Sequence, residues 1–291
     1  MATTIQDQIL TQNKWQYDPN FRAEVSVKYR DIFYLLTDNF IDKDVSLSIS
    51  GLRRVGKTTI LFQIINFLLD KKTNTQHIFY FQFSDDSTGL EKVLESYFSH
   101  FTDEIISRGE FYIFLDELQY VKGWQNTLKN YIDRNKRIKF IVTGSASIYL
   151  RNQTKESLAG RILDFKLDPL SFSEMIRLKD NYKDKYSIHR ILTDNNDIEN
   201  NLKKLNFERL PFQKYFKNYL RFGEFPALIP YLENFEYSGK YLQNGIIDKI
   251  LQKDIRLFEV EKQDEINVLY KICCSNTAQM ISLRNVSRET E

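Results

Sequence analysis

Cysteine, histidine and long apolar runs are all scarce in this sequence. The two cysteines, Cys273 and Cys274, are adjacent, and neighbours of this kind seldom form a structural disulfide. The three histidines lie far apart, so no Cys/His cluster has the spacing of a metal site. The N-terminus lacks a basic-then-apolar signal pattern, and no apolar run approaches the roughly 18 residues of a membrane span. We therefore expect a soluble, reduced, cytoplasmic protein with no membrane partner.

Net charge is also small, because 41 Lys and Arg are offset by 39 Asp and Glu to leave +2. Bulk charge therefore gives no argument for a nucleic-acid partner. The charge is uneven, since residues 121–166 contain ten Lys or Arg and three acids. This excess predicts either a basic binding surface or an ordinary solvated face. With 291 residues, 22 Phe and 17 Tyr, the chain can bury one large core or two smaller ones.

Apolar runs alternate with helical patterns over the first 170 residues. Strands are expected at residues 45–50, 77–83, 111–118, 138–145 and 161–170, and helices at 29–40, 59–72, 89–106 and 124–135. Strands that are near-continuous apolar runs between helices indicate an α/β fold with a parallel sheet covered on both faces. We predict a core domain over residues 1–168, a mainly helical lid domain over 169–264, and a C-terminal segment over 265–291.

One loop carries the strongest chemical signal. Residues 51–58, GLRRVGKT, fit the phosphate-binding pattern G-x-x-x-x-G-K-[ST] between a predicted strand and a predicted helix. The glycines let backbone N–H groups curl around a phosphate, and the helix directs its positive end at the same charge. Lys57 would reach the β- and γ-phosphates, and Thr58 would offer its hydroxyl to Mg²⁺. The expected nucleotide-binding residues are Gly51, Arg54, Val55, Gly56, Lys57, Thr58 and Thr59.

Two arginines in this loop need a separate explanation. Phosphate binding requires Lys57 and backbone N–H groups, but it does not require the side chains of Arg53 and Arg54. For these two side chains we favour a structural or interdomain ion pair over direct contact with phosphate.

An acidic strand end predicts the second half of the site. Asp116 and Glu117 follow the apolar run of residues 111–115. Asp116 would hold Mg²⁺ through water, and Glu117 would polarise the water that attacks the nucleotide. This pair favours hydrolysis over transfer to a small acceptor. The Asn-Lys-x-Asp signature of GTPases is missing, so ATP is the expected nucleotide.

The next predicted strand ends in Thr143-Gly144-Ser145. In a sheet of this class that strand lies between the phosphate-loop strand and the acidic strand. A polar side chain there can touch the γ-phosphate or the attacking water. Thr143 and Ser145 both qualify, and a simple loop turn is the alternative.

Six motifs in order carry a family resemblance: GLRRVGKTT, FLDELQ, VTGSAS, SLAGR, LDPLSFSEM and YLRFGEFPAL. Over about residues 29–258 the chain resembles the AAA+ ATPases of the archaeal and bacterial GxRRxGKTT group, distant relatives of the origin-recognition and STAND ATPases. The resemblance implies a core sheet of strand order 5-1-4-3-2 followed by a helical lid. Members often continue into a winged helix and a further domain.

The resemblance also implies roles for individual residues. Arg161 in SLAGR looks like an arginine finger, which would act in trans on the nucleotide of a neighbour in a homo-oligomer; a surface or ion-pairing arginine is the alternative. Pro226 in GEFP resembles a lid motif that packs against adenine, and a plain helix-start proline is the alternative. The usual lid arginine has no clear counterpart, although Arg221 lies nearby.

The C-terminal segment leaves two readings open. Residues 265–274 are expected to form a helix, and residues 282–291 resemble the start of the second helix of a winged helix-turn-helix. We expect either a truncated winged helix, through which DNA would bind, or an ordinary helical tail.

Three functions remain open from the sequence. The first is an ATP-hydrolysing AAA+ enzyme that remodels or loads a partner. The second is a nucleotide-operated switch that stays bound to ADP and hydrolyses very slowly. The third is a DNA-binding module with ATP as a structural ligand, which Lys57, Asp116 and Glu117 argue against.

Overall fold

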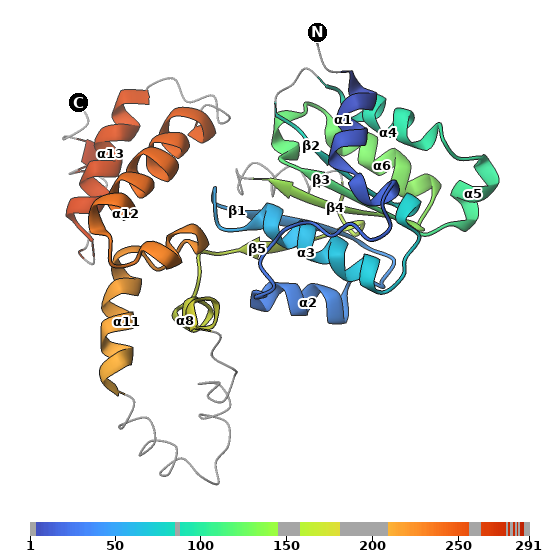
Figure 1. Cartoon of the computed structure of the whole chain (residues 1–291). Helices are drawn as coiled ribbons and strands as arrows, with labels where there is room; N and C mark the ends of the chain where they lie inside the picture. Colours follow the sequence, from blue (N-terminus) through green and yellow to red (C-terminus); the bar gives the residue numbers. More distant parts are fainter. Residues whose placement is uncertain are drawn as a thin grey trace. The chain divides into compact units, whose positions relative to one another are not determined.

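The computed structural model describes residues 4–84, 88–144, 158–180, 209–255 and 263–277, and beyond these residues 279, 282, 284, 286 and 287. The chain divides into two compact units, Met1–Phe235 and Glu236–Glu291 (Figure 1). Among the described residues, no helix combines the length and the apolar character that crossing a bilayer would need. The domain boundaries predicted after residues 168 and 264 remain predictions.

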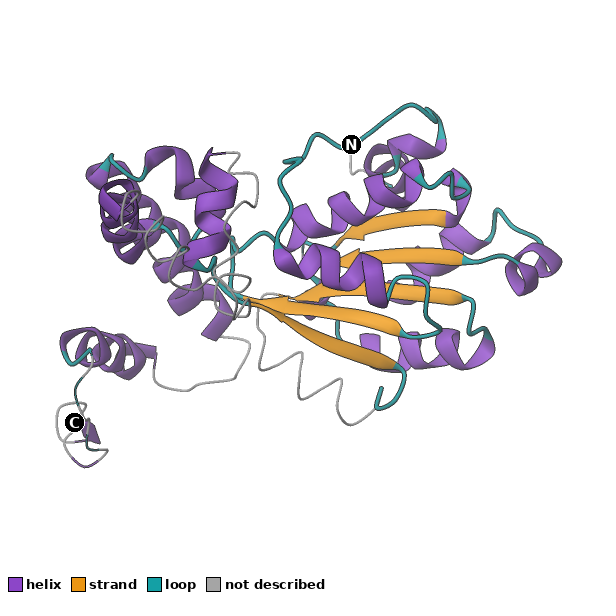
Figure 2. Ribbon diagram, turned by 90° about the horizontal axis from the view of Figure 1, so that it is seen from below, coloured by secondary structure: helices purple, strands orange, loops and turns teal. Residues whose placement is uncertain are grey.

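A parallel sheet forms the centre of the first unit (Figure 2). It has five strands in the order β2-β3-β4-β1-β5. Read from the other edge this is 5-1-4-3-2, so the predicted fold class and strand order are confirmed. The strands are β1 (Ser46–Gly51), β2 (Ile78–Gln82), β3 (Phe111–Asp116), β4 (Ile138–Gly144) and β5 (Ile162–Leu167). Every residue of β1, β3 and β4 is buried, as expected for strands covered on both faces.

Helices cover both faces of the sheet (Figure 2). On one face α3 packs on β1 and β4, and α2 packs on α3; on the other, α6 packs on β4 and α4 packs on α6. The bounds are α2 (Asp31–Asn39), α3 (Lys57–Asp70), α4 (Leu90–Phe98), α5 (Asp103–Arg108) and α6 (Trp124–Arg134). The core beneath α4 and α6 is rich in aromatic rings, including Phe79, Phe81, Phe111 and Phe140.

Two local predictions were wrong or incomplete. The single helix predicted over residues 89–106 is two helices, because Thr102 has extended backbone and its hydroxyl accepts the Ile105 N–H to begin α5. The first residues of the chain also hold an unpredicted helix, α1 (Ile5–Gln12), whose Thr4 and Asp7 form a capping box. Helix α1 packs against β2 and α4.

After β5 the first unit becomes helical. It contains α8 (Phe172–Asp180), α11 (Arg209–Phe222) and the 3₁₀ segment η4 (Pro226–Tyr231). Leu170, Met175, Ile176 and Leu232 form a small apolar core among these elements. Helix α12 (Phe235–Leu242) leads into the second unit, which holds two π-helical segments, η5 (Gln243–Ile247) and η6 (Ile250–Asp254), and α13 (Gln263–Ser275).

Candidate functional site

The loop between β1 and α3 has the backbone shape of a phosphate-binding loop. Gly56, directly before α3, has φ of 105°, a left-handed conformation that a side chain would strain. Gly51 is required for another reason, because a Cβ there would lie 2.3 Å from the backbone oxygen of Leu167 on β5. Val55 is fully buried and anchors the loop in the core. The two glycines of the motif are therefore both demanded by the structure.

Lys57 is the first residue of α3 and its side chain is buried. Its Nζ donates to the carbonyl oxygens of Gly51 and Leu52, at 3.0 Å and 2.9 Å. The ammonium group is thus hydrogen-bonded to the first two residues of the loop. It stands beside the positive end of a 14-residue helix. Both features favour an anion at this position.

Asp116, at the carboxyl end of β3, is the centre of a buried hydrogen-bond cluster. Its Oδ2 accepts from the hydroxyls of Thr58, at 2.6 Å, and Tyr80, at 3.0 Å. Its Oδ1 accepts from the Thr143 hydroxyl and, at 3.1 Å, from the Glu117 N–H. These donors fill the about four positions at which a carboxylate accepts hydrogen bonds. Asp116 is completely buried, so its carboxylate is held in one orientation.

The cluster joins predicted and unpredicted residues. Thr58, Asp116 and Thr143 come together as the sequence suggested, while Ser145 lies outside the described residues. Tyr80 was not expected, because nothing in the pattern of β2 indicates that its hydroxyl reaches β3. Burial, followed by the nearby charges of Asp116 and Glu117, raises the pKa of the Tyr80 hydroxyl far above its ordinary value. Tyr80 therefore remains a neutral donor.

Glu117 directly follows β3 and has a left-handed backbone, with φ of 57°. Its N–H also donates to the Thr143 hydroxyl at 3.1 Å. Its carboxylate accepts a hydrogen bond from the side-chain amide of Gln119, which is itself buried. Such a conformation is costly for a residue other than glycine.

The arginines of the loop have structural contacts. Arg53 donates to the Tyr120 hydroxyl at 2.8 Å, and Arg54 adopts a left-handed backbone with φ of 63°. A third arginine, missed by the sequence analysis, also touches the loop: Arg30 donates to the Val55 carbonyl at 3.0 Å. Its sequence position, 21 residues before the motif, gives no signal of this contact.

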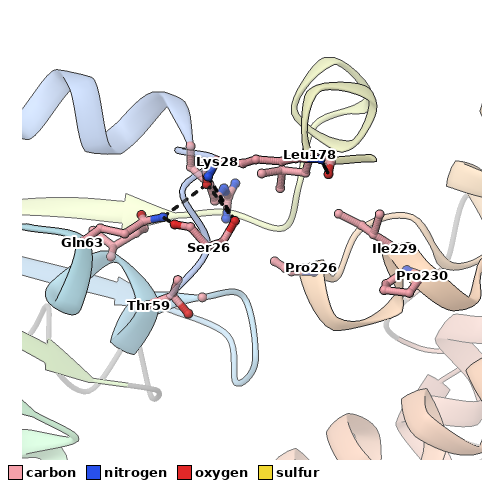
Figure 3. A pocket seen from close by; sticks show the side chains of 11 residues that line it. Ser26, Lys28, Thr59, Gln63, Leu178, Pro226, Ile229 and Pro230 are labelled. Atoms are coloured by element: carbon pink, nitrogen blue, oxygen red, sulfur yellow. Dashed lines mark hydrogen bonds between the residues drawn. The ribbon is translucent and has the colours of Figure 1, made fainter. Parts of the chain in front are cut away.

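A pocket of about 200 Å³ opens beside the loop (Figure 3). One wall comes from the loop and α3, with Gly56, Thr59, Ile60 and Gln63, and the facing wall comes from η4, with Pro226, Ile229 and Pro230. A Cβ built on Gly56 would be 3.9 Å from the ring of Pro226. The structure thus brings Pro226 and Thr59 to the same pocket, next to the loop.

Figure 3 also shows the polar contacts along one side of this pocket. The Gln63 amide donates to the carbonyl oxygens of Ser26, at 2.7 Å, and Lys28, at 3.2 Å. Lys28 Nζ in turn donates to the Leu178 carbonyl at 2.6 Å. The segment before α2 is therefore tied to both α3 and α8, and it forms a floor for the pocket.

Arg161 is not part of this cluster. It lies at the amino end of β5, whereas the phosphate-type loop follows the carboxyl end of the parallel neighbour β1. Its guanidinium pairs with Asp133 of α6 through contacts of 2.6 Å and 3.0 Å. Arg221, near the expected lid arginine, lies over the Phe235 ring at 4.9 Å. Neither arginine reaches the loop of its own chain through these contacts.

Comparison with known proteins gives one family match. The model of the family described as AAA domain matches residues 43–176, which run from just before β1 into α8. An uncharacterized protein of Haemophilus influenzae is 26% identical over 217 residues, covering 74% of this chain and 47% of the relative. An uncharacterized protein of Methanocaldococcus jannaschii is 27% identical over 271 residues, covering 90% and 55%. The chain thus spans about half the length of the curated relatives it matches.

Solved structures of other proteins are also similar to this chain. A Walker-type ATPase of Pyrococcus abyssi has a TM-score of 0.43 and 16% identity, covering 90% of this chain and 81% of that one. AMPPCP-bound DnaA from Aquifex aeolicus has a TM-score of 0.40 and 14% identity, covering 94% and 87%.

The sheet order, the loop and the family match agree with one another. Five parallel strands in the order 2-3-4-1-5 place the loop after β1 and the acidic end of β3 at the same edge of the sheet. The AAA domain match spans both. Together they indicate a P-loop domain that is similar to the AAA domain family.

Proposed function

We propose that this chain binds ATP with Mg²⁺ at the loop of residues 51–58 and hydrolyses its β–γ bond. The observation that carries the proposal is the 2.6 Å hydrogen bond between Thr58 and Asp116. It joins the first turn of α3 to the acidic end of β3, so the phosphate-binding and metal-binding halves of the site meet at one point. The narrower resemblance, to the GxRRxGKTT group, belongs to the same proposal.

Phosphate binding would use the loop backbone and Lys57. The left-handed Gly56 and the N-terminal turn of α3 direct N–H groups into the loop. Lys57 Nζ would exchange its contacts with the Gly51 and Leu52 carbonyls for β- and γ-phosphate oxygens. This exchange replaces neutral acceptors by charged ones, and charge-assisted hydrogen bonds are the stronger kind.

The residues present fit Mg²⁺, which prefers oxygen ligands and keeps several waters. Thr58 would supply a direct hydroxyl ligand, and Asp116 would accept a hydrogen bond from a Mg²⁺-bound water in place of one of its present donors. In the described part of the chain, no group of three or more His, Cys, Asp and Glu side chains is arranged to hold a metal. Mg²⁺ held at Thr58 would neutralise charge on the triphosphate.

The adenine base would enter the pocket beside the loop. Ile60, Pro226 and Ile229 give it apolar walls, as small-molecule pockets commonly have. The Pro226 ring lies beside the Gly56 backbone where the pocket adjoins the loop, so base and phosphates would occupy adjoining spaces. This arrangement supports the lid role predicted for Pro226.

Glu117 would act as the general base toward the attacking water. The Gln119 side-chain amide donates a hydrogen bond to the Glu117 carboxylate, and a carboxylate that accepts such a bond polarises water less. This observation favours the second candidate, a switch that hydrolyses slowly with the same residues.

Coupling to a partner is the wider part of the proposal. Arg161 lies at the other end of the β1–β5 pair from the loop of its own chain, so an action on nucleotide would be in trans on a second copy and would require release from Asp133. DNA as a partner rests on the basic excess at residues 121–166 and on the C-terminal sequence alone. Residues 278–291 are mostly outside the described part of the chain.

The test is Lys57→Ala, titrated with ATP, ADP and adenosine by calorimetry. We expect ATP and ADP to bind at least about tenfold more weakly, since charged hydrogen bonds contribute about 1.5–3 kcal/mol each, while adenosine affinity stays unchanged. Lys71→Ala is the matched control, because Lys71 follows the other end of α3 and pairs with Asp42 on the surface. Equal ATP affinity in Lys57→Ala and wild type would refute the assignment of the loop.

A further inference from the structure

Arg30 joins four parts of the first unit through one buried guanidinium. Its Nε and Nη2 donate to the two carboxylate oxygens of Glu174 on α8, at 3.0 Å and 2.8 Å. Its Nη1 donates to the Val55 carbonyl at 3.0 Å, and Nη2 also lies 3.4 Å from the Pro169 carbonyl after β5. Arg30 itself directly precedes α2. The phosphate loop, β5, α2 and α8 therefore share one side chain.

Glu174 also accepts several hydrogen bonds. Besides Arg30, it accepts the Asp31 N–H at 3.2 Å and the Ser171 N–H at 3.1 Å. The side chains of Arg30 and Glu174 are only 9% and 7% exposed. Burial raises the pKa of the Glu174 carboxyl, but the hydrogen bonds and charge of Arg30 outweigh burial and the net pKa is lowered. The pair is thus a fully engaged ion pair in the interior.

Through its hydrogen bond to the Val55 carbonyl, Arg30 also contacts the loop directly. The Val55 carbonyl and the Gly56 N–H belong to one planar peptide unit. A guanidinium that fixes the direction of the carbonyl also fixes the direction of that N–H, which is a phosphate donor in a loop of this shape. The direction of the donor therefore depends on Arg30, and Arg30 is aligned by Glu174 of α8.

We propose that the Arg30–Glu174 pair is a positioning element that couples the phosphate affinity of the loop to the placement of helix α8. This inference rests on the proposed function. Because coupling between two sites is reciprocal, a partner that displaces α8 would weaken phosphate binding, and phosphate binding would stabilise α8. A bidentate buried pair is suited to this role, since it has one geometry and loses it when either partner moves.

The competing explanation is that the Arg30–Glu174 pair only stabilises the fold and has no effect on phosphate binding. A neighbouring ion pair serves as the control for it. Arg177 of α8 pairs with Asp31 of α2 at 2.5 Å, so it joins the same two helices. Asp31 is 63% exposed there, so this pair joins α8 to α2 at the surface, whereas the Arg30 guanidinium donates to the Val55 carbonyl of the loop. Arg177→Ala therefore removes a link between α2 and α8 without touching Val55.

The experiment titrates the full 291-residue chain with inorganic pyrophosphate and with ADP by calorimetry. Pyrophosphate has no base, so changes in the base pocket, which Arg30 also lines, do not affect it. The double variant Arg30→Met with Glu174→Met removes both charges together, which avoids leaving one charge buried alone. We expect both ligands to bind about tenfold more weakly to it, within the usual range of coupling between sites. Arg177→Ala should bind both as wild type does.

A second measurement distinguishes positioning of the loop from structural stabilisation alone. Hydrogen exchange of the α8 amides should slow on ADP binding in wild type and in Arg177→Ala, and should not respond in the double variant. If the double variant does not fold, Glu174→Gln, which keeps the side-chain size and lies outside the base pocket, must show the same two effects.

Wild-type pyrophosphate affinity in a folded variant, or an unchanged response of α8, would overturn the coupling. Failure of the wild-type chain to bind either ligand would instead refute the proposed function, so the two failures are distinguishable.

Discussion

The loss of stability expected for Gly51→Ala can be worked out from the structure. In Gly51→Ala the new Cβ would lie 2.3 Å from the Leu167 carbonyl oxygen, and 3.3 Å from both the Leu167 carbonyl carbon and Cγ2 of Val55. The nearest atom belongs to the backbone of β5, the direct strand partner of Gly51, so it cannot rotate away as a side chain would. The end of β1 and the start of the loop must move instead.

Forcing extra atoms into a packed interior of this kind costs about 1–3 kcal/mol. For a unit of this size, each kcal/mol lowers the melting temperature by roughly 2–4 °C. Gly51→Ala should therefore melt roughly 2–12 °C below wild type. Because the displaced residue begins the phosphate loop, ADP affinity should fall as well.

The assay is thermal unfolding followed by circular dichroism, together with ADP calorimetry on the folded variant. Gly89→Ala is the control, since a Cβ there meets nothing within 4 Å and the backbone is extended, with φ of −68°. If Gly51→Ala is as stable as Gly89→Ala and binds ADP as wild type does, then the backbone of β5 does not exclude a side chain at position 51.

Two further predictions concern residues away from the nucleotide. Burial lowers the pKa of Lys139 to about 8, against about 10.4 in the unfolded chain, so the unfolded state binds more protons between these values. The free energy of unfolding of wild type should therefore rise from pH 8 to pH 10 relative to Lys139→Met, and parallel pH profiles in urea titrations would contradict this. The Asn13 side chain pairs with both the N–H and the carbonyl of Tyr80 on the edge strand β2, at 2.7 Å and 2.9 Å. Asn13→Ala should lose about 1–3 kcal/mol of stability by leaving these buried groups unpaired, and a loss no larger than that of the exposed Asn39→Ala would count against it.

The sheet and the loop could be predicted because their signals are local. Near-continuous apolar runs such as residues 111–115 and 140–142 are typical of strands in a sheet covered on both faces, and the spacing of Gly51, Gly56 and Lys57 carries its own chemistry. The capping box of Thr4 and Asp7 was an equally local signal that would have located α1.

The rest of the site depends on contacts between distant parts of the chain. Tyr80 reaches Asp116 only because β2 and β3 are neighbours, and Arg30 reaches Glu174 across 144 residues of sequence. Neither residue stands in a pattern that indicates its partner. The break between α4 and α5 was hidden because the apolar periodicity continues through it, while the Thr102 cap decides the outcome.

The central claim, hydrolysis of ATP at this loop, is tested most directly by Glu117→Gln. With saturating ATP and Mg²⁺ in a single-turnover measurement, we expect wild-type ATP affinity and a rate lower by roughly 10²–10⁴, the usual contribution of a general base. Glu110→Gln is the matched control, because Glu110 is exposed just before the amino end of β3, at the other edge of the sheet. Hydrolysis at the wild-type rate in Glu117→Gln would contradict the account.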